Sequence, residues 1–201
     1  MPAHFYPVGL KRGGCMATES DKDKEETGQD APEKLVAPEG DAPLLSGRFS
    51  GRTEFQQLVR AALAQAAKEG WREIVVSDAN FEDWPLGERA VSESLQAWAG
   101  SGRKFIMLAK TYDDVLRRHA RFVNWRRKWA HVIECWRCSS ADALELPSAI
   151  WSPAWSMRRL DIERSTGVCG PEAERRVLLR ESINEWLRQS SPGFPASTLG
   201  L

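Results

Sequence analysis

The segment Glu73-Ile74-Val75-Val76-Ser77-Asp78 is the strongest structural signal in this chain of 201 residues. Its β-branched apolar centre lies between polar residues, which is typical of a strand that is buried on both faces of a sheet. Two similar apolar segments follow, at residues 105–109 and 132–136. Helical patterns separate the three segments, so we predict neighbouring parallel strands that are joined by right-handed helical crossovers.

The flanking segments carry helical patterns. Thr53 and Gln56 have the spacing of a capping box, and apolar residues recur at helical spacing from there to Gly70. Further helices are predicted at 88–99, 113–125 and 171–189, and two short strands at 149–151 and 155–160. The predicted fold class is α/β, with an open, mainly parallel sheet, helices on both faces and an antiparallel hairpin at one edge.

Charge is distributed unevenly along a chain whose formal net charge is zero. Residues 1–47 carry nine acidic against five basic side chains, and residues 48–201 carry 19 acidic against 23 basic ones. Most of the first segment lacks large apolar residues and cannot offset the entropy cost of ordering. We therefore predict a disordered acidic tail at 1–47, a single α/β domain at 48–191 and an irregular tail at 192–201.

The cysteines and the hydropathy exclude several classes of protein. Four cysteines, of which Cys135 and Cys138 form a lone CxxC, do not make a disulfide framework. Alternation along a strand sends these two thiols to opposite faces, so we expect structural cysteines rather than a redox pair or zinc ligands. No apolar run of about 18 residues occurs, which excludes a membrane-spanning helix. We expect a cytoplasmic protein without a cofactor.

Basic residues concentrate around the helix predicted at 113–125. Between residues 103 and 128 there are nine basic and two acidic side chains. At 100° per residue, several of the basic side chains share one exposed face with a tryptophan beside it, a combination that suits an acidic protein or nucleic acid. The alternative is an ordinary solvated face. The predicted partner-binding residues are Arg117, Arg118, Arg121, Trp125 and Lys128.

An acidic loop follows the first predicted strand. Asp78, Asn80 and Asp83 could hold Mg²⁺ through their oxygens at the carboxyl end of the sheet, where ligands bind in open parallel sheets. This arrangement would suit a metal-assisted phosphoryl or phosphodiester hydrolase. The alternative is that Asp78 and Asn80 cap a turn through backbone hydrogen bonds. His119 lies on the apolar face of its predicted helix, where a hydrogen-bonded core histidine is expected.

The stretch from Phe55 to Cys138 resembles uncharacterised bacterial domains that are similar to one half of the phospholipase D-like fold. The features that carry the resemblance are the helix before the first strand, the strand at 74–78 with its acidic loop, and the strand at 104–108. A polar helix and the strand at 132–136 complete the set.

Active members of that superfamily have a histidine, a lysine two residues later and an aspartate five residues after the lysine. Here His119 is followed by Arg121 and Arg126, and His131 by Ile133. The resemblance therefore implies a catalytically degenerate copy, and no catalytic residue is assigned.

The leading hypothesis from the sequence is a non-catalytic binding or adaptor domain whose basic helix contacts an anionic partner. The hydrolase is the first alternative. A structural subunit that docks through exposed tryptophans near 151–155 is the second.

Overall fold

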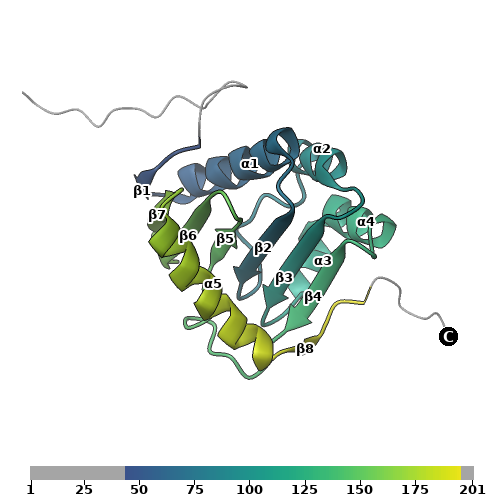
Figure 1. Cartoon of the computed structure of the whole chain (residues 1–201). Coiled ribbons are helices and arrows are strands. Elements are labelled where there is room, and N and C mark those ends of the chain that lie inside the picture. Colours follow the sequence, from purple (N-terminus) through teal and green to yellow (C-terminus); the bar gives the residue numbers. More distant parts are fainter. Residues whose placement is uncertain (1–43, 196–201) are drawn as a thin grey trace, which may run out of the picture. The chain divides into compact units, whose positions relative to one another are not determined.

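The computed structural model describes residues 44–195, which form eight strands and five helices (Figure 1). The predicted disorder of residues 1–43 and the end of the predicted C-terminal tail, 196–201, lie outside the described residues. The elements are β1 (Gly47–Phe49), α1 (Arg52–Glu69), β2 (Glu73–Asp78), α2 (Arg89–Trp98), β3 (Lys104–Ala109), α3 (Asp113–Arg118), α4 (Ala120–Lys128), β4 (Ile133–Arg137), β5 (Ala149–Trp151), β6 (Ser156–Asp161), β7 (Thr166–Gly170), α5 (Ala173–Arg188) and β8 (Ser191–Pro192).

All eight strands belong to one sheet, in the order β1-β7-β6-β5-β2-β3-β4-β8. The three strands predicted from the sequence are parallel neighbours, as expected: Val75 lies opposite Ile106, and Phe105 lies opposite Ile133. Every other pairing is antiparallel. The expectation of a mainly parallel sheet is therefore wrong, because the fold is a mixed α/β fold in which most strand pairs are antiparallel.

The predicted hairpin exists but does not lie at the edge. β5 and β6 are antiparallel, with Ile150 opposite Met157. However, β5 also pairs with β2, where Val76 lies opposite Ile150, so the hairpin continues the sheet on the free side of β2. Without β5, that side of β2 would expose unpaired backbone donors and acceptors. β7 and then β1 extend the sheet further.

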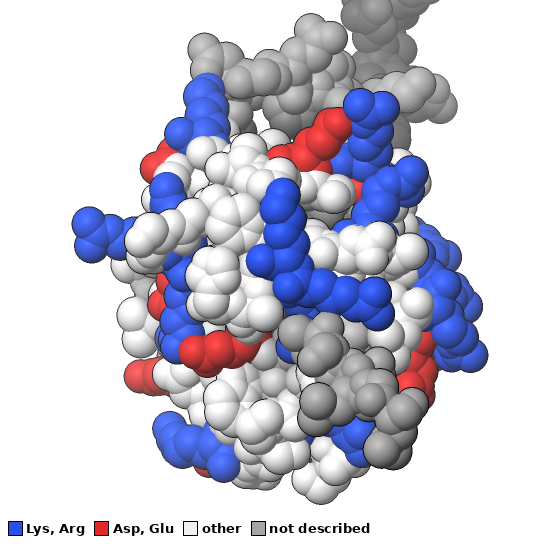
Figure 2. Space-filling view, turned by 90° about the vertical axis from the view of Figure 1, so that its right-hand side faces the viewer, with Lys and Arg blue, Asp and Glu red and all other residues white. Residues whose placement is uncertain are grey.

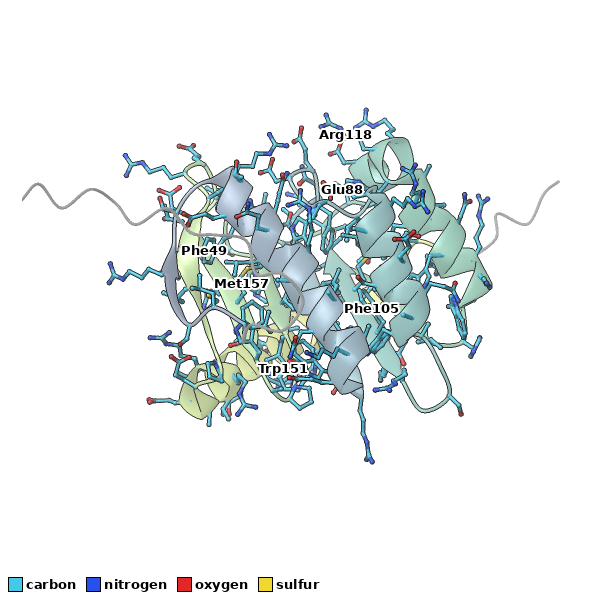
Figure 3. All side chains as sticks on the ribbon, turned by 90° about the horizontal axis from the view of Figure 1, so that it is seen from above. Phe49, Glu88, Phe105, Arg118, Trp151 and Met157 are labelled. Carbon is cyan, nitrogen blue, oxygen red and sulfur yellow. The ribbon has the colours of Figure 1, made fainter. Side chains whose placement is uncertain are left out.

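Helices cover both faces of the sheet, as predicted. The larger core lies between the sheet and helices α1, α2 and α4, and it contains Phe55, Phe105 and Phe122. The smaller core lies under α5, where Leu179 and Ile183 pack near Val75. Figure 3 shows Phe105 inside the domain and Arg118 at its edge. The six apolar residues predicted to face inward from α1 are all buried: Phe55, Leu58, Val59, Ala62, Leu63 and Ala66.

The sequence pattern describes the end of α1, but not its start and not all of α5. Gly70 ends α1 in the left-handed conformation, as predicted. The predicted capping box is absent, because Gln56 donates to the backbone oxygen of Asp83 and Glu54 accepts from the backbone N–H of Ser50 instead. In α5, the side chains of Val177 and Leu178 are more than half exposed although both are apolar. The buried residues of α5 are Leu179 and Ile183.

The ordered domain extends beyond the predicted boundary at both ends. Leu45 packs against the larger core, and its backbone oxygen accepts from the Trp155 indole at 3.0 Å. At the other end, the Phe194 ring is buried and stacks on Tyr112 at 4.9 Å. Residues 44–47 and 192–195 are therefore parts of the fold. Each segment carries few apolar residues, and these find partners that are distant in sequence.

Cys135 and Cys138 lie on opposite faces of the sheet, as the strand alternation predicts. Cys135 belongs to the larger core and Cys138 to the smaller one. Both are buried free thiols. Burial raises the pKa of Cys135, so its thiol is neutral at physiological pH. These positions suit packing and leave the two sulfur atoms unable to share a disulfide or a metal.

Candidate functional site

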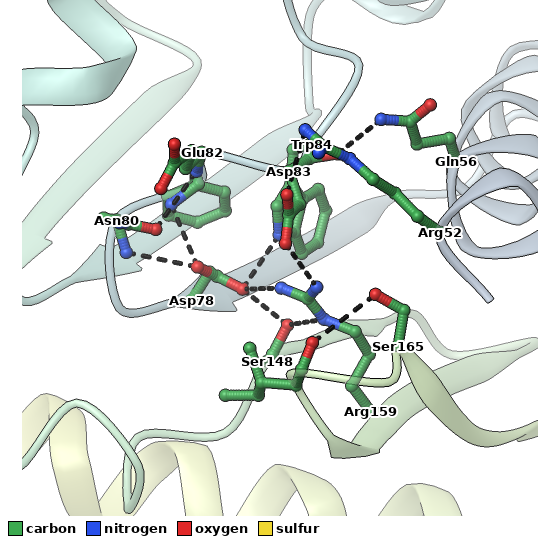
Figure 4. Close-up of polar contacts among 12 residues, drawn as sticks. Arg52, Gln56, Asp78, Asn80, Glu82, Asp83, Trp84, Ser148, Arg159 and Ser165 are labelled. Atoms are coloured by element: carbon green, nitrogen blue, oxygen red, sulfur yellow. Dashed lines mark hydrogen bonds and ion pairs between the residues drawn. The ribbon is translucent and has the colours of Figure 1, made fainter. Parts of the chain in front are cut away.

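Asp78, at the carboxyl end of β2, is enclosed by protein donors (Figure 4). One carboxylate oxygen accepts the backbone N–H groups of Asn80 and Phe81 at 3.1 and 2.9 Å. The other oxygen accepts from the Trp84 indole at 2.9 Å and from the Ser148 hydroxyl. These are the turn-capping contacts that the sequence offered as the alternative to metal binding, with two side-chain donors in addition.

Arg159 on β6 is the principal partner of this carboxylate, although it is not among the site residues predicted from the sequence. Its guanidinium contacts Asp78 at 2.7 Å and Asp83 at 3.2 Å (Figure 4). It also donates to the Ser148 hydroxyl at 2.7 Å and lies over the Phe55 ring, 4.2 Å from the centroid. The Arg159 side chain is 1% exposed. A signal existed: in a strand, Arg159 lies on the same side as the buried Met157.

The acidic loop therefore has a structural role. Asp83 is shared between Arg159 and Arg52, whose guanidinium lies 3.0 Å away. The side-chain oxygen of Asn80 accepts the backbone N–H of Glu82 at 3.1 Å. The oxygens that the hydrolase alternative assigned to Mg²⁺ are thus engaged by protein donors. In residues 44–195, no three His, Cys, Asp or Glu side chains come together in a way that could hold a metal ion.

The basic segment forms two helices rather than one. α3 ends at Arg118, His119 takes a non-helical conformation, and α4 begins at Ala120. A single helical wheel therefore does not describe the segment. Arg117 and Arg118 both pair with Asp114, at 3.2 and 3.5 Å, and Arg118 also pairs with Glu82 at 2.9 Å. Two of the predicted partner-binding cations are thus compensated by acids.

Trp125 is not at the surface, which corrects its predicted role as a partner-binding residue. It is 4% exposed and packs against Phe105 and Phe122, with ring centroids 5.6 Å apart in each case. The tryptophan belongs to the larger core. The indole N–H has no partner among the described residues, so Trp125 contributes to α4 as a packing residue.

Three exposed cations on α4 lack an acidic partner among the described residues. Arg121 donates to the backbone oxygen of Gly87 at 2.9 Å, and Lys128 contacts the Gln96 side chain at 3.4 Å. Arg127, also exposed, completes the set. We call Arg121, Arg127 and Lys128 the α4 face. At 100° per residue, Arg121 and Lys128 lie on one side of the helix, and Arg127 lies about 120° around it and lines a neighbouring pocket. Figure 2 shows the side of the molecule on which α3, α4 and β4 lie, where Lys and Arg side chains are more prominent than acidic ones.

A pocket of about 240 Å³ opens beside the α4 face, near the carboxyl ends of β3 and β4. We call it the arginine pocket because three of its wall residues are arginines. Tyr112 and Phe194 form a stacked aromatic wall. The lining residues are Thr111, Tyr112, Asp113, Leu116, Val123, Arg126, Arg127, Arg137, Phe194 and Pro195.

The predicted docking tryptophans do not form an exposed patch. Trp155 is 3% exposed. Trp151 is half-buried: its indole N–H donates to the Arg176 backbone oxygen at 2.9 Å, and Arg180 lies over its ring at 4.6 Å. Both rings therefore pack within the domain. The exposed tryptophan patch that the structural-subunit alternative requires is not present near residues 151–155.

His119 is the buried joint between α3 and α4, as the sequence predicted for a core histidine. Its Nε2 lies 3.0 Å from the Phe81 backbone oxygen. Burial lowers the pKa of His119 below its ordinary value, so the folded state favours the neutral ring.

This histidine makes a specific pH dependence expected. The unfolded chain takes up a proton near pH 6.5, whereas the folded chain takes it up only at lower pH. The contribution of His119 to the free energy of unfolding should therefore be constant well above pH 6.5 and fall as the pH drops through 6.5 toward the folded-state pKa. Urea titrations at several pH values should show that His119→Gln reduces this fall. The exposed His131→Gln variant is the control, and parallel curves for wild type and His119→Gln would contradict the assignment.

The geometry defines a single mixed α/β domain with a cationic side and a pocket beside it. No protein-family model matches the chain, and no curated protein matches it in sequence. Among solved structures, TrmBL2 is similar in fold; it is an archaeal chromatin protein whose structure is described as showing a novel mode of DNA binding.

The TM-score between the two structures is 0.55 at 15% sequence identity, and the match covers 77% of this chain and 56% of the other. The matched region thus spans little more than half of that neighbour's length. At this identity the likeness concerns the fold alone. No helix in residues 44–195 is both long and apolar enough to span a membrane.

Proposed function

We propose that this protein is a non-catalytic binding domain that contacts nucleic acid through the α4 face. The observation that carries the proposal is the set of exposed cations without acidic partners among the described residues, Arg121, Arg127 and Lys128. Uncompensated cations favour a polyanion because each phosphate that they neutralise releases condensed counterions. Arg117 and Arg118 contribute less, since Asp114 and Glu82 already pair with them.

Two further observations support nucleic acid over an acidic protein. The fold resembles that of TrmBL2, a protein described as binding DNA. Arg121 and Lys128 are also two helical turns apart, about 10 Å along the axis at 1.5 Å per residue. A duplex presents one negative charge per about 1.7 Å of its axis, so both cations can reach phosphates at once.

We propose a non-catalytic function because the side chains that could act as acids, bases or nucleophiles are buried and engaged in contacts within the fold. Asp78 is held by Arg159 and by four other donors, and His119 is buried against the Phe81 backbone oxygen. Cys135 is a buried neutral thiol. Each of these groups already has a structural role.

Charge reversal on the α4 face should weaken binding of a short fluorescent DNA duplex. We expect Arg121→Glu/Lys128→Glu to reduce the affinity by about tenfold or more at moderate salt. The slope of log affinity against log salt should become shallower by about 1.8, or about 0.9 for each lost phosphate contact. Fluorescence anisotropy over a salt series measures both quantities.

The matched control is Arg48→Glu/Arg158→Glu, which changes the net charge equally on β1 and β6, at the other end of the sheet. Arg48 and Arg158 are also exposed, and neither has an acidic partner among the described residues. The control should keep the wild-type salt slope. Absence of duplex binding by the wild type at low salt, or equal losses in the two double variants, would overturn the proposal.

A further inference from the structure

Two arginines of the described chain are almost fully buried, and only one of them has a counterion. Arg159 is 4% exposed and lies between two carboxylates. Arg126 is 6% exposed and has no carboxylate within ion-pair distance among the described residues. Its Nε contacts the Cys135 sulfur at 3.3 Å, and its guanidinium lies over the Phe194 ring, 4.8 Å from the centroid. One terminal nitrogen is buried and has no hydrogen-bond partner among those residues.

The groups that touch Arg126 do not neutralise it. Burial raises the pKa of the Cys135 thiol, and it also raises the pKa of Tyr112, which lines the same pocket. Both groups are therefore uncharged at physiological pH. A buried charge without a partner is costly to a fold, and one partner of a buried pair is rarely retained alone. Arg126 thus has the environment of an arginine whose counterion comes from outside the described residues.

The arginine pocket supplies a place for that counterion. Arg126, Arg127 and Arg137 all line it, and the last two are exposed with no acidic partner among the described residues. Asp113 is the acidic side chain in the lining. Three positive charges against one negative charge leave a local excess of two. A phosphate monoester carries a charge of about −1.5 to −2 near neutral pH and offers three acceptor oxygens, which matches this excess.

We propose that the arginine pocket binds a phosphate monoester, with Arg126 as the buried contact and Arg127 and Arg137 as the outer ones. A phosphodiester carries a single negative charge and would leave part of the excess unmatched. The remaining walls, Leu116, Val123 and Phe194, can contact the carbon part of the ester. This site does not require that the α4 face binds nucleic acid, although Arg127 borders both surfaces.

Binding can be tested on the full chain by calorimetry and thermal unfolding with four probes. The three small probes are inorganic phosphate, a nucleoside 5′-monophosphate and the same nucleoside without phosphate; the fourth probe is a single strand, compared with a 5′-phosphate and with a 5′-hydroxyl. We expect both small phosphates to bind and raise the unfolding temperature, and the bare nucleoside to do neither. A 5′-phosphorylated strand that binds more tightly than both the 5′-hydroxyl strand and the nucleotide would identify a nucleic-acid end as the source. A nucleotide that binds more tightly than either strand would identify a small metabolite.

Two variants connect the binding to the pocket. Arg126→Met should remove the phosphate-dependent temperature shift, yet leave the unfolding temperature without phosphate unchanged or higher, because it removes an unpaired buried charge. Arg137 is exposed, so Arg137→Gln should leave the fold intact. It should weaken phosphate binding at least tenfold, and this test holds even if Arg126→Met fails to fold. Arg48→Gln, far along the sheet on β1, should bind phosphate as the wild type does.

The outcomes separate this site from the α4 face. Arg121→Glu/Lys128→Glu should keep phosphate binding while it loses duplex binding. The proposal is overturned if the wild type does not bind phosphate at millimolar concentration, if the bare nucleoside binds as well as the nucleotide, or if Arg137→Gln binds phosphate with unchanged affinity.

Discussion

Replacement of Arg159 by methionine should lower the free energy of unfolding by about 3–5 kcal/mol, because it leaves the buried Asp78 carboxylate without its counterion. For a domain of this size, that corresponds to a fall in the midpoint of thermal unfolding of roughly 6–20 °C. Asp83 and Ser148 would lose a donor in the same step. Urea and thermal unfolding followed by circular dichroism would measure the effect.

The matched control for this variant is Arg126→Met. Both substitutions remove a nearly buried guanidinium and put the same apolar side chain in its place, but only Arg159 is paired with acids. Arg159→Met/Asp78→Asn should cost less than the sum of its two single changes, since the second change removes the stranded charge. Equal losses for Arg159→Met and Arg126→Met would show that the carboxylate pairs do not decide the stability of this region.

Phe105→Ala should cost about 3–5 kcal/mol of unfolding free energy, the range for removal of a buried aromatic side chain. Phe105 on β3 is fully buried and contacts Trp98 of α2 together with Phe122 and Trp125 of α4. Helices α2 and α4 therefore both pack on the Phe105 ring. The cavity would therefore loosen the packing of both.

Leu144→Ala is the control for that prediction, because Leu144 is 80% exposed and its loss should change the stability by less than about 0.5 kcal/mol. Chemical unfolding of the two variants under one set of conditions gives the comparison. A loss below about 1.5 kcal/mol for Phe105→Ala would mean that the aromatic cluster repacks around the missing ring.

The elements with strong local patterns could be predicted from the sequence. The strand at Glu73–Asp78 has the predicted bounds, and α1 buries the predicted apolar residues. A period of two or of 3.6 residues reports which side of a segment faces a core, and this signal requires no knowledge of the partner. The same signal was available for Arg126, which follows the buried Phe122 by four residues on α4, and it was missed because arginine is rarely buried.

The antiparallel part of the sheet beyond the hairpin of β5 and β6 could not be predicted from the same patterns. β1 has three residues, and β8 has two. Each gains its stability from a partner elsewhere in the chain: Phe49 lies opposite Gly167, and Pro192 lies opposite Trp136. Segments this short have no period to detect. A local pattern also does not indicate that β5 pairs with β2 and is not at the edge of the sheet.

The sequence by itself determined the three parallel strands, the helices that separate them and the concentration of basic residues between 103 and 128. Only the tertiary structure decided what the charged residues do. It places Arg159 against an aspartate 81 residues away, pairs Arg117 and Arg118 with acids, and leaves Arg126 buried in a pocket without an acidic partner among the described residues. The physical reason is that the energy of a charge depends on its burial and on its nearest opposite charge, and both are set by contacts between distant parts of the chain.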